Sequence, residues 1–284
     1  MKYAFEGKLT AVWRTQNKPS RRKNCWSKSK SSAKRQYQQQ LAEWQKANAE
    51  GKGTKKPPKP QKPREFSPLT EAELAEMPEG WCWMKLGEIT TNFDGKRVPL
   101  SKKYREAFKG AFPYYGACEI IDYVREYLFE GEYLLIGEDG ANLLSRSKPL
   151  AFIVSGKFWV NNHAHVLQSR GGNLHKFIEH QFNSLNLNQY VTGTAQPKLT
   201  QANLEKIPFR LCSILEQHQI VQEIESRLSV CDKLEGSLKE SLQKAEALRQ
   251  SILKKAFAGK LVPQDPNDEP AEKLLERIRA EKTQ

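Results

Sequence analysis

The side chains with the clearest chemical potential form a basic and aromatic cluster just after Asp94-Gly95. Its cations are Lys96, Arg97, Lys102, Lys103, Arg105 and Lys109. Aromatic residues alternate with them, namely Tyr104, Phe108, Tyr114 and Tyr115. Lysine and arginine contact nucleic-acid phosphates, and arginine also reads base edges. The cluster therefore predicts a DNA-binding surface, with a solvated basic loop as the alternative.

Other polar residues on loops within 81–210 extend this prediction. Arg146 and Lys148 follow a loop at 140–142, and Gln196 and Lys198 lie in a polar stretch near the end of the region. Arginine, lysine, asparagine and glutamine are the side chains that read base edges through paired hydrogen bonds. The predicted DNA-binding set is the basic cluster with Tyr115, Arg146, Lys148, Gln196 and Lys198, and no residue is assigned to a base.

Residue patterns for catalysis are weak. His163 and His165 stand two apart, which places both imidazoles on one strand face, but no cysteine or acid follows at zinc spacing. Glu138-Asp139 and Lys148 match a nuclease pattern poorly. The middle region has no glycine-rich cofactor loop before a helix, and we see no Asp/Asn-Pro-Pro-aromatic tetrapeptide. We therefore expect no catalytic residue, no metal site and no cofactor, with a structural or DNA-contacting role for the two histidines.

The positive charge is concentrated near the N-terminus. The net charge is +13, and residues 1–65 hold 18 Lys or Arg against 4 Asp or Glu. A basic stretch of this kind is either a solvated linker or a non-specific phosphate contact. Five scattered cysteines without a C-x-x-C pair favour a reducing, cytoplasmic location. No apolar run is long enough for a membrane span.

Residues 81–210 predict a mixed α/β domain. Strands are expected over 133–136 and 165–168, and 151–154 with 158–160 should form a hairpin around Ser155-Gly156-Lys157. A helix is expected over 174–185. Before this domain, residues 31–50 favour a helix, 55–64 an extended Pro/Lys-rich linker, and 70–76 a short acidic helix.

From residue 215 the pattern becomes that of one long helix with a heptad-like apolar stripe. Its predicted dimerisation residues are Val221, Ile224, Leu228, Leu234, Leu238, Leu242, Leu248 and Ile252. A helix of about 40 residues spans about 60 Å and must bury its stripe on another long helix. Because the chain offers no second helix of that length, the stripe predicts a coiled coil with a second chain. Gly259 should end the helix, and a last short helix is expected over 271–282.

A hexapeptide occurs at both ends of the chain. Residues 4–9 (AFEGKL) and 256–261 (AFAGKL) agree at five of six positions. The second copy closes the long helix, so the first is interpreted as the end of a similar helix. The chain therefore has the pattern of a repeating architecture, with the end of one repeat unit followed by one complete unit.

Ordered motifs in 1–14 and 78–284 resemble the specificity (S) subunits of type I restriction–modification systems. Residues 78–89 (PEGWCWMKLGEI) resemble the entry to a target recognition domain, and 192–200 (TGTAQPKLT) with Ile207-Pro208 resemble its exit. Residues 215–218 (LEQH) and 256–261 resemble the two ends of a conserved spacer helix. The resemblance implies a non-enzymatic DNA reader whose usual form has two recognition domains separated by two antiparallel spacer helices. Its partners would be double-stranded DNA, methyltransferase (M) subunits and, through the complex, restriction (R) subunits, with no membrane.

This chain departs from the usual plan because it holds one recognition domain and one spacer helix. We expect the remnant of a first spacer at 1–14, a basic helix and linker at 15–77, and a mixed α/β recognition domain at 78–210. A coiled-coil spacer helix at 211–262 and a C-terminal link and helix at 263–284 follow. A half-length subunit would pair as a homodimer and read a palindromic bipartite target. Two alternatives remain, namely a truncated or split subunit that needs another chain, and a decoy that binds only M subunits.

Overall fold

The fold is that of a computed structural model, which describes residues 2–17, 38, 41–42, 44–46, 48–49, 77–193, 195–263 and 265–282. It divides into two units, residues 1–225 and residues 226–284. The linker expected at 55–64 and the helix expected over 70–76 lie outside the described residues. So does most of the helix expected over 31–50, although its described positions are helical.

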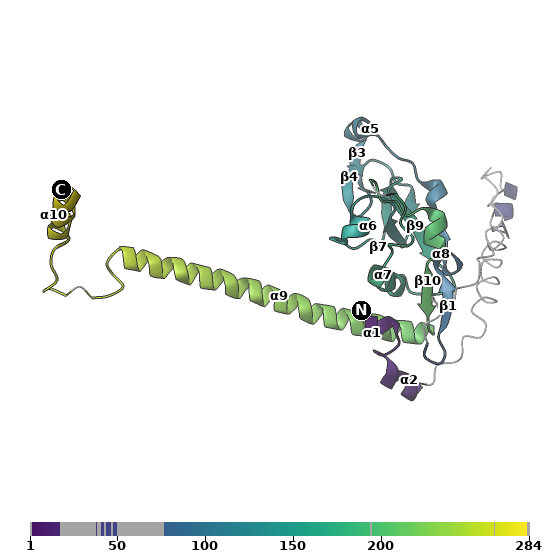
Figure 1. The fold of residues 1–284 in the computed structure, drawn as a ribbon. Helices are drawn as coiled ribbons and strands as arrows, with labels where there is room; N and C mark the ends of the chain where they lie inside the picture. The colour runs from purple at the N-terminus through teal and green to yellow at the C-terminus, as the bar shows by residue number, and fades with distance from the viewer. Residues whose placement is uncertain are drawn as a thin grey trace. The chain divides into compact units, whose positions relative to one another are not determined.

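Three small sheets form the frame of the first unit (Figure 1). The first pairs β1 (Cys82–Lys85) with β10 (Pro208–Leu211), so the entry and exit of the domain lie side by side. The second has the order β2-β9-β6-β7, with β2 at Thr90–Asn92, β9 at Ala164–Ser169, β6 at Tyr133–Gly137 and β7 at Ala151–Val154. The third has the order β4-β3-β8-β5, with β4 at Ile120–Val124, β3 at Lys109–Tyr115, β8 at Lys157–Val160 and β5 at Phe129–Glu130.

Strand β6 is buried on both faces, which explains its unbroken apolar run. Leu134 and Ile136 belong to the main core cluster, whereas Tyr133 and Leu135 face a second cluster shared with the third sheet. Successive side chains of a strand point to opposite faces, so one strand can serve two cores. The strands predicted at 133–136 and 165–168 are confirmed by β6 and β9.

The predicted hairpin around Ser155-Gly156-Lys157 is wrong. β7 pairs with β6, whereas β8 leaves that sheet and pairs with β3 and β5. Gly156 has φ +92° and exchanges two backbone hydrogen bonds with Gly131. The chain changes direction at Gly156 and continues from the second sheet into the third. Strands β7 and β8 are both apolar enough to be buried in a core. Their composition does not specify the partner strand of either.

Short helices complete the first unit. They are α4 (Leu86–Ile89), the 3₁₀ turn η2 (Asp94–Lys96), α5 (Lys102–Ala107), α6 (Asn142–Ser145), α7 (His175–Ser184) and α8 (Gln201–Lys206). The helix predicted over 174–185 is confirmed by α7. Helix α5 lies at the tip of the unit beside β3 and β4 (Figure 1).

The N-terminal residues fold onto this unit. Helices α1 (Lys2–Phe5) and α2 (Ala11–Asn17) lie against the beginning of the long helix (Figure 1). Glu216 is 1% exposed, and its two carboxylate oxygens accept hydrogen bonds from Thr10, Arg14 and Trp81 at 2.7–3.0 Å. This contact ties residues 10–14 to a position more than 200 residues later in the chain.

The long helix α9 (Ile214–Phe257) has 44 residues, about 66 Å at 1.5 Å per residue. It begins in the first unit and continues into the second, which also contains α10 (Ala271–Lys282). Both predicted helices are confirmed. Helix α9 ends at Phe257, just before the predicted stop at Gly259, which has φ +66°. Among the described residues, no helix combines the length and apolar character needed to cross a bilayer.

Candidate nucleic-acid interface

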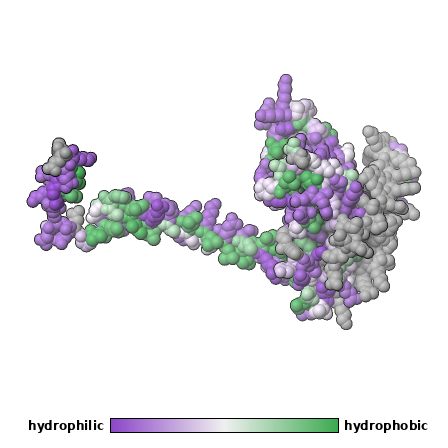
Figure 2. Space-filling model, viewed as in Figure 1, coloured by the Kyte–Doolittle hydropathy of each residue, from purple (hydrophilic) through white to green (hydrophobic). Residues whose placement is uncertain are grey.

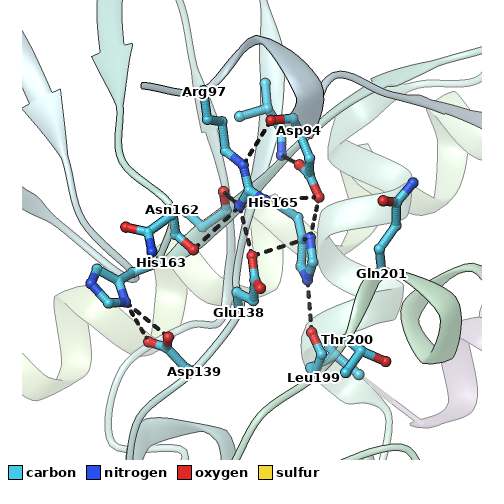
Figure 3. Close-up of polar contacts among 12 residues, drawn as sticks. Asp94, Arg97, Glu138, Asp139, Asn162, His163, His165, Leu199, Thr200 and Gln201 are labelled. Atoms are coloured by element: carbon cyan, nitrogen blue, oxygen red, sulfur yellow. Dashed lines mark hydrogen bonds and ion pairs between the residues drawn. The ribbon is translucent and has the colours of Figure 1, made fainter. Parts of the chain in front are cut away.

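His165 is the centre of a buried polar network that includes Asp94, Arg97 and Glu138 (Figure 3). Its side chain is 1% exposed, with Nδ1 2.6 Å from Asp94 Oδ2 and Nε2 2.8 Å from the Leu199 carbonyl oxygen. Both ring nitrogens face oxygen atoms of other segments, so the His165 ring joins β9 to the Asp94 turn and to the exit segment.

Glu138 forms the second half of this network. Its carboxylate accepts from Arg97 Nη1 at 2.7 Å and from Lys198 Nζ at 3.1 Å. Arg97 also donates to the Ala164 carbonyl oxygen at 2.7 Å, and the Leu199 amide donates to the Glu138 carbonyl oxygen at 2.7 Å. Three loops that are distant in sequence are therefore fixed together at one end of the second sheet (Figure 3).

The two carboxylates are stabilised in their charged form. Burial alone would raise the pKa of Asp94, but the hydrogen bond and positive charge of His165 outweigh it and lower that pKa. Burial also opposes ionisation of Glu138, whose pKa is nevertheless lowered by the hydrogen bond from Arg97, the charge of His165 and the bond from Lys198. The surroundings of each carboxylate therefore stabilise its ionised form more than its protonated form.

This arrangement predicts acid sensitivity of the first unit. Both pKa values are lower in the folded than in the unfolded chain, so the stabilisation is complete above about pH 4.3 and is lost as the pH falls through the folded values. Asp94→Asn and Glu138→Gln should lower the free energy of unfolding at pH 7 and flatten its decline between pH 5 and 3. Urea unfolding at a series of pH values measures this. Glu119→Gln is the control, because that side chain is 61% exposed, and an equal flattening there would contradict the prediction.

The predicted basic cluster separates by residue type. Its two arginines point inward. Arg97 joins the buried network, and Arg105 pairs with Asp122 at 3.0 Å, donates to the Leu100 carbonyl oxygen and lies over the Tyr114 ring. The four lysines are exposed, namely Lys96, Lys102, Lys103 and Lys109.

The same segment is held in place by further hydrogen bonds. Trp159 Nε1 donates to the Val98 carbonyl oxygen at 2.7 Å, and the Leu100 amide donates to the Tyr114 hydroxyl at 3.0 Å. Ser101 caps α5 by accepting from the Tyr104 amide. Residues 96–109 thus present lysines on a firmly anchored backbone.

The other predicted residues have different surroundings. Tyr115 is half-buried against Phe152 and Phe158, and the Arg146 guanidinium donates to the Leu185 carbonyl oxygen at 2.6 Å. Burial lowers the pKa of Arg146, which is also the only described non-glycine residue with positive φ.

Three predicted residues remain at the surface. Lys148 is paired with Glu119 at 2.6 Å, Lys198 stays half-exposed beside Glu138, and Gln196 is exposed. Their headgroups are therefore within reach of a ligand approaching from solvent.

Asp94, Glu138 and His165 place one potential ligand atom each within 4.8 Å of the others, a spacing that a metal ion could use. Arg97 and Lys198 already pair with the Glu138 carboxylate, so a cation there would meet two positive side chains. His163 pairs separately with Asp139 at 2.8 Å. Lys148 pairs with Glu119, whereas Glu138 pairs with Arg97 and Lys198. The four described cysteines form no disulfide with one another, and Cys25 lies outside the described residues.

Sequence reasoning missed Asp94 and His165 as the hub of this site. A signal was present, since His165 is a polar residue inside a strand with Ala164, Val166 and Leu167. A buried polar group in such a strand needs a hydrogen-bonding partner. The partner could not be named from spacing, because Asp94 is 71 residues earlier.

The apolar stripe of α9 changes its environment along the helix. Val221 and Ile224 were predicted in the dimer seam, but Ile224 is 5% exposed and both pack in the core of the first unit. This part of the prediction is corrected, because the helix packs its first turns on its own domain. The other predicted seam residues are 41–72% exposed, namely Leu228, Leu234, Leu238, Leu242, Leu248 and Ile252. Figure 2 shows hydrophobic side chains at the surface along this helix.

Comparisons with known proteins identify the family of this chain. Residues 78–244 match the family described as the type I restriction modification DNA specificity domain. A putative type I restriction enzyme specificity subunit of Haemophilus influenzae, S.HindORF215P, is 36% identical over 140 residues, which cover 49% of this chain and 35% of that protein. The EcoAI specificity subunit of Escherichia coli is 26% identical, over 83% of this chain and 49% of that protein.

A solved structure reported for complex assembly and conformational transition of the type I R-M system has the same fold. Its TM-score is 0.53 at 17% identity, over 90% of this chain and 58% of that one. The chain spans about half the length, or less, of the curated relatives it matches. Since the family match covers more than half of the chain, and includes the domain that carries the lysine surface, the assignment is clear: this chain belongs to the type I restriction–modification DNA specificity family.

Proposed function

We propose that this chain is a non-catalytic DNA reader that recognises one half of a bipartite target, pairs with a second copy through α9 and docks M subunits. DNA reading is supported by the different roles of the arginines and the lysines in residues 96–109. Arginines anchor the segment internally, and its four lysines are exposed to solvent. Such a surface offers phosphate contacts from a fixed backbone, which lets neighbouring side chains reach base edges in register.

The exposed stripe from Leu228 to Ile252 supports the pairing. A helix that leaves leucines 60–72% exposed over several turns gains free energy by covering them. An antiparallel partner of the same sequence would present an identical stripe and would place the two recognition domains at opposite ends. Two-fold symmetry would then make the target palindromic with a fixed gap. The proposal that the chain docks M and R subunits is supported by the family to which the chain belongs.

Selection from random DNA duplexes tests the proposal directly. The purified chain, alone and with its M subunit, should enrich a short motif, and in the paired state two inverted copies at constant spacing. A decoy that only engages M subunits would enrich no motif in either sample, and that result would overturn the proposal.

Removing the exposed lysines should weaken DNA binding in a salt-dependent way. Lys102→Gln, Lys103→Gln and Lys109→Gln together should reduce the slope of log affinity against log salt by about 0.9 for each lysine that contacts a phosphate. Fluorescence anisotropy with the selected duplex at several salt concentrations measures the slope. The matched control replaces Lys157, Lys176 and Lys206, which are also exposed lysines of the first unit, by glutamine. Equal slopes for the two triple variants would count against this surface.

A further inference from the structure

The two hexapeptides form the same structure. After α1, the Lys8 amide bonds to the Tyr3 carbonyl oxygen at 3.0 Å and the Gly7 amide to that of Ala4 at 3.2 Å. After α9, the corresponding bonds run from Lys260 to Lys255 at 2.8 Å and from Gly259 to Ala256 at 3.0 Å. Both glycines are left-handed, with φ +72° at Gly7 and +66° at Gly259. These are the bonds of one helix-ending motif, so the sequence repeat is also a structural repeat.

The surroundings of the two copies are opposite. Phe5 is 4% exposed, and its ring packs edge-on against Phe177 with 5.6 Å between centroids. Arg210 donates to the Phe5 carbonyl oxygen at 3.0 Å. Phe257, at the matching position of the second copy, is 89% exposed. One copy therefore has a built docking surface, defined here by Phe177, Arg210 and Glu216, and the other presents the same aromatic side chain to solvent.

The copies differ beyond the hexapeptide. Residues 10 and 14 supply the hydroxyl and guanidinium that bind Glu216, whereas the matching positions of the second copy are Val262 and Pro266. The first copy therefore makes polar contacts that the second cannot. It also reaches the surface from within the same chain.

The place of the docking surface matches the geometry of an antiparallel pair. Glu216 belongs to the first turn of α9, and the second hexapeptide begins with the last two residues of α9, Ala256 and Phe257. When two α9 helices lie antiparallel in full register, the end of one helix arrives beside the beginning of the other. The exposed Phe257 of one chain then reaches the docking surface of its partner.

We infer that residues 256–261 are a docking element for the recognition domain of a second copy, where they compete with that copy's own residues 4–9. The inference rests on the proposed pairing through α9. It adds that the docking surface holds either the hexapeptide of its own chain or that of its partner. The polar contacts of Thr10 and Arg14 favour the internal copy, so exchange depends on how firmly that copy is held.

Photo-crosslinking in the full chain tests the inference. Phe257 is replaced by p-benzoylphenylalanine, chains labelled with ¹⁵N and ¹⁴N are mixed, and crosslinked peptides are identified by mass spectrometry. Interchain crosslinks to peptides containing Phe177 or Arg210 are expected. Their yield should rise at least threefold in a Phe5→Ala background, because the competing ring is removed. A protease site inserted at residues 55–64, cleaved to release the first copy, is a second way to vacate the surface without a core substitution.

The outcomes separate the two proposals. The same photoreactive residue at position 238 should crosslink α9 to α9 in any antiparallel pair. Crosslinks from position 238 with none from position 257 to the docking surface, in all three backgrounds, would overturn the docking and leave the pairing standing. A chain that is monomeric by light scattering and forms no interchain crosslink from either position would overturn both.

Discussion

Replacing Glu216 by alanine should lower the free energy of unfolding of the first unit by about 3 kcal/mol. The carboxylate is almost fully buried and accepts hydrogen bonds from three side chains, and Arg14 lies at 2.7 Å with its own side chain 16% exposed. Removing the acceptor leaves a mostly buried guanidinium and the Trp81 N–H without their partner. Such losses cost more than the pair contributes, because the remaining groups keep their desolvation penalty.

Chemical unfolding followed by tryptophan fluorescence measures this change. Glu216→Gln should fall between the wild type and Glu216→Ala, because an amide oxygen can accept one of the bonds. Glu225→Ala is the matched control, being an exposed glutamate on the same helix, and should alter stability by no more than about 0.5 kcal/mol. Equal effects at positions 216 and 225 would show that residues 10–14 do not depend on this carboxylate.

The second large effect is expected at the exposed stripe. Leu238→Asp with Leu242→Asp should convert a dimer of the chain to a monomer. If each leucine contributes at least about 1.5 kcal/mol when covered, four substitutions per dimer remove about 6 kcal/mol, or about four orders of magnitude in Kd. Both side chains are more than 70% exposed in the single chain, so the recognition domain should keep its stability.

Sedimentation or light scattering across a range of concentrations measures the change in mass. The control pair is Ala247→Asp with Ser251→Asp, which puts the same charges on the opposite side of the helix at exposed positions. A wild-type chain that is already monomeric, or a Leu238→Asp/Leu242→Asp variant that stays dimeric, would refute the assignment of the stripe.

Elements with a local signal could be predicted closely. The last helix has the predicted bounds, and α9 ends at Phe257, just before the predicted Gly259. Strands β6 and β9 and helix α7 lie where alternation and periodicity place them. The family resemblance rested on ordered short motifs, and the comparisons confirm it. Such signals survive in a sequence because they depend on neighbours within a few residues.

Strand pairing and side-chain partnership could not be predicted. The β7–β8 hairpin failed because Gly156 passes the chain to another sheet, which depends on contacts with Gly131. In the sequence, Arg97 and Arg105 cannot be distinguished from the neighbouring lysines. In the structure, Arg97 pairs with Glu138 and Arg105 with Asp122, which belong to other segments of the chain. A basic residue shows its charge in the sequence, but its direction is decided by which acceptors the fold brings near.

The sequence by itself determined the family, the mixed α/β domain followed by a long helix, and the repeated hexapeptide at the two ends. Only the tertiary structure decided that Val221 and Ile224 belong to the domain core while the later leucines stay exposed, since one heptad pattern serves both environments. It also decided that Phe5 is buried and Phe257 is not. The same residues in the same local conformation differ because burial depends on what packs against them, and for Phe5 that is Phe177, 172 positions later.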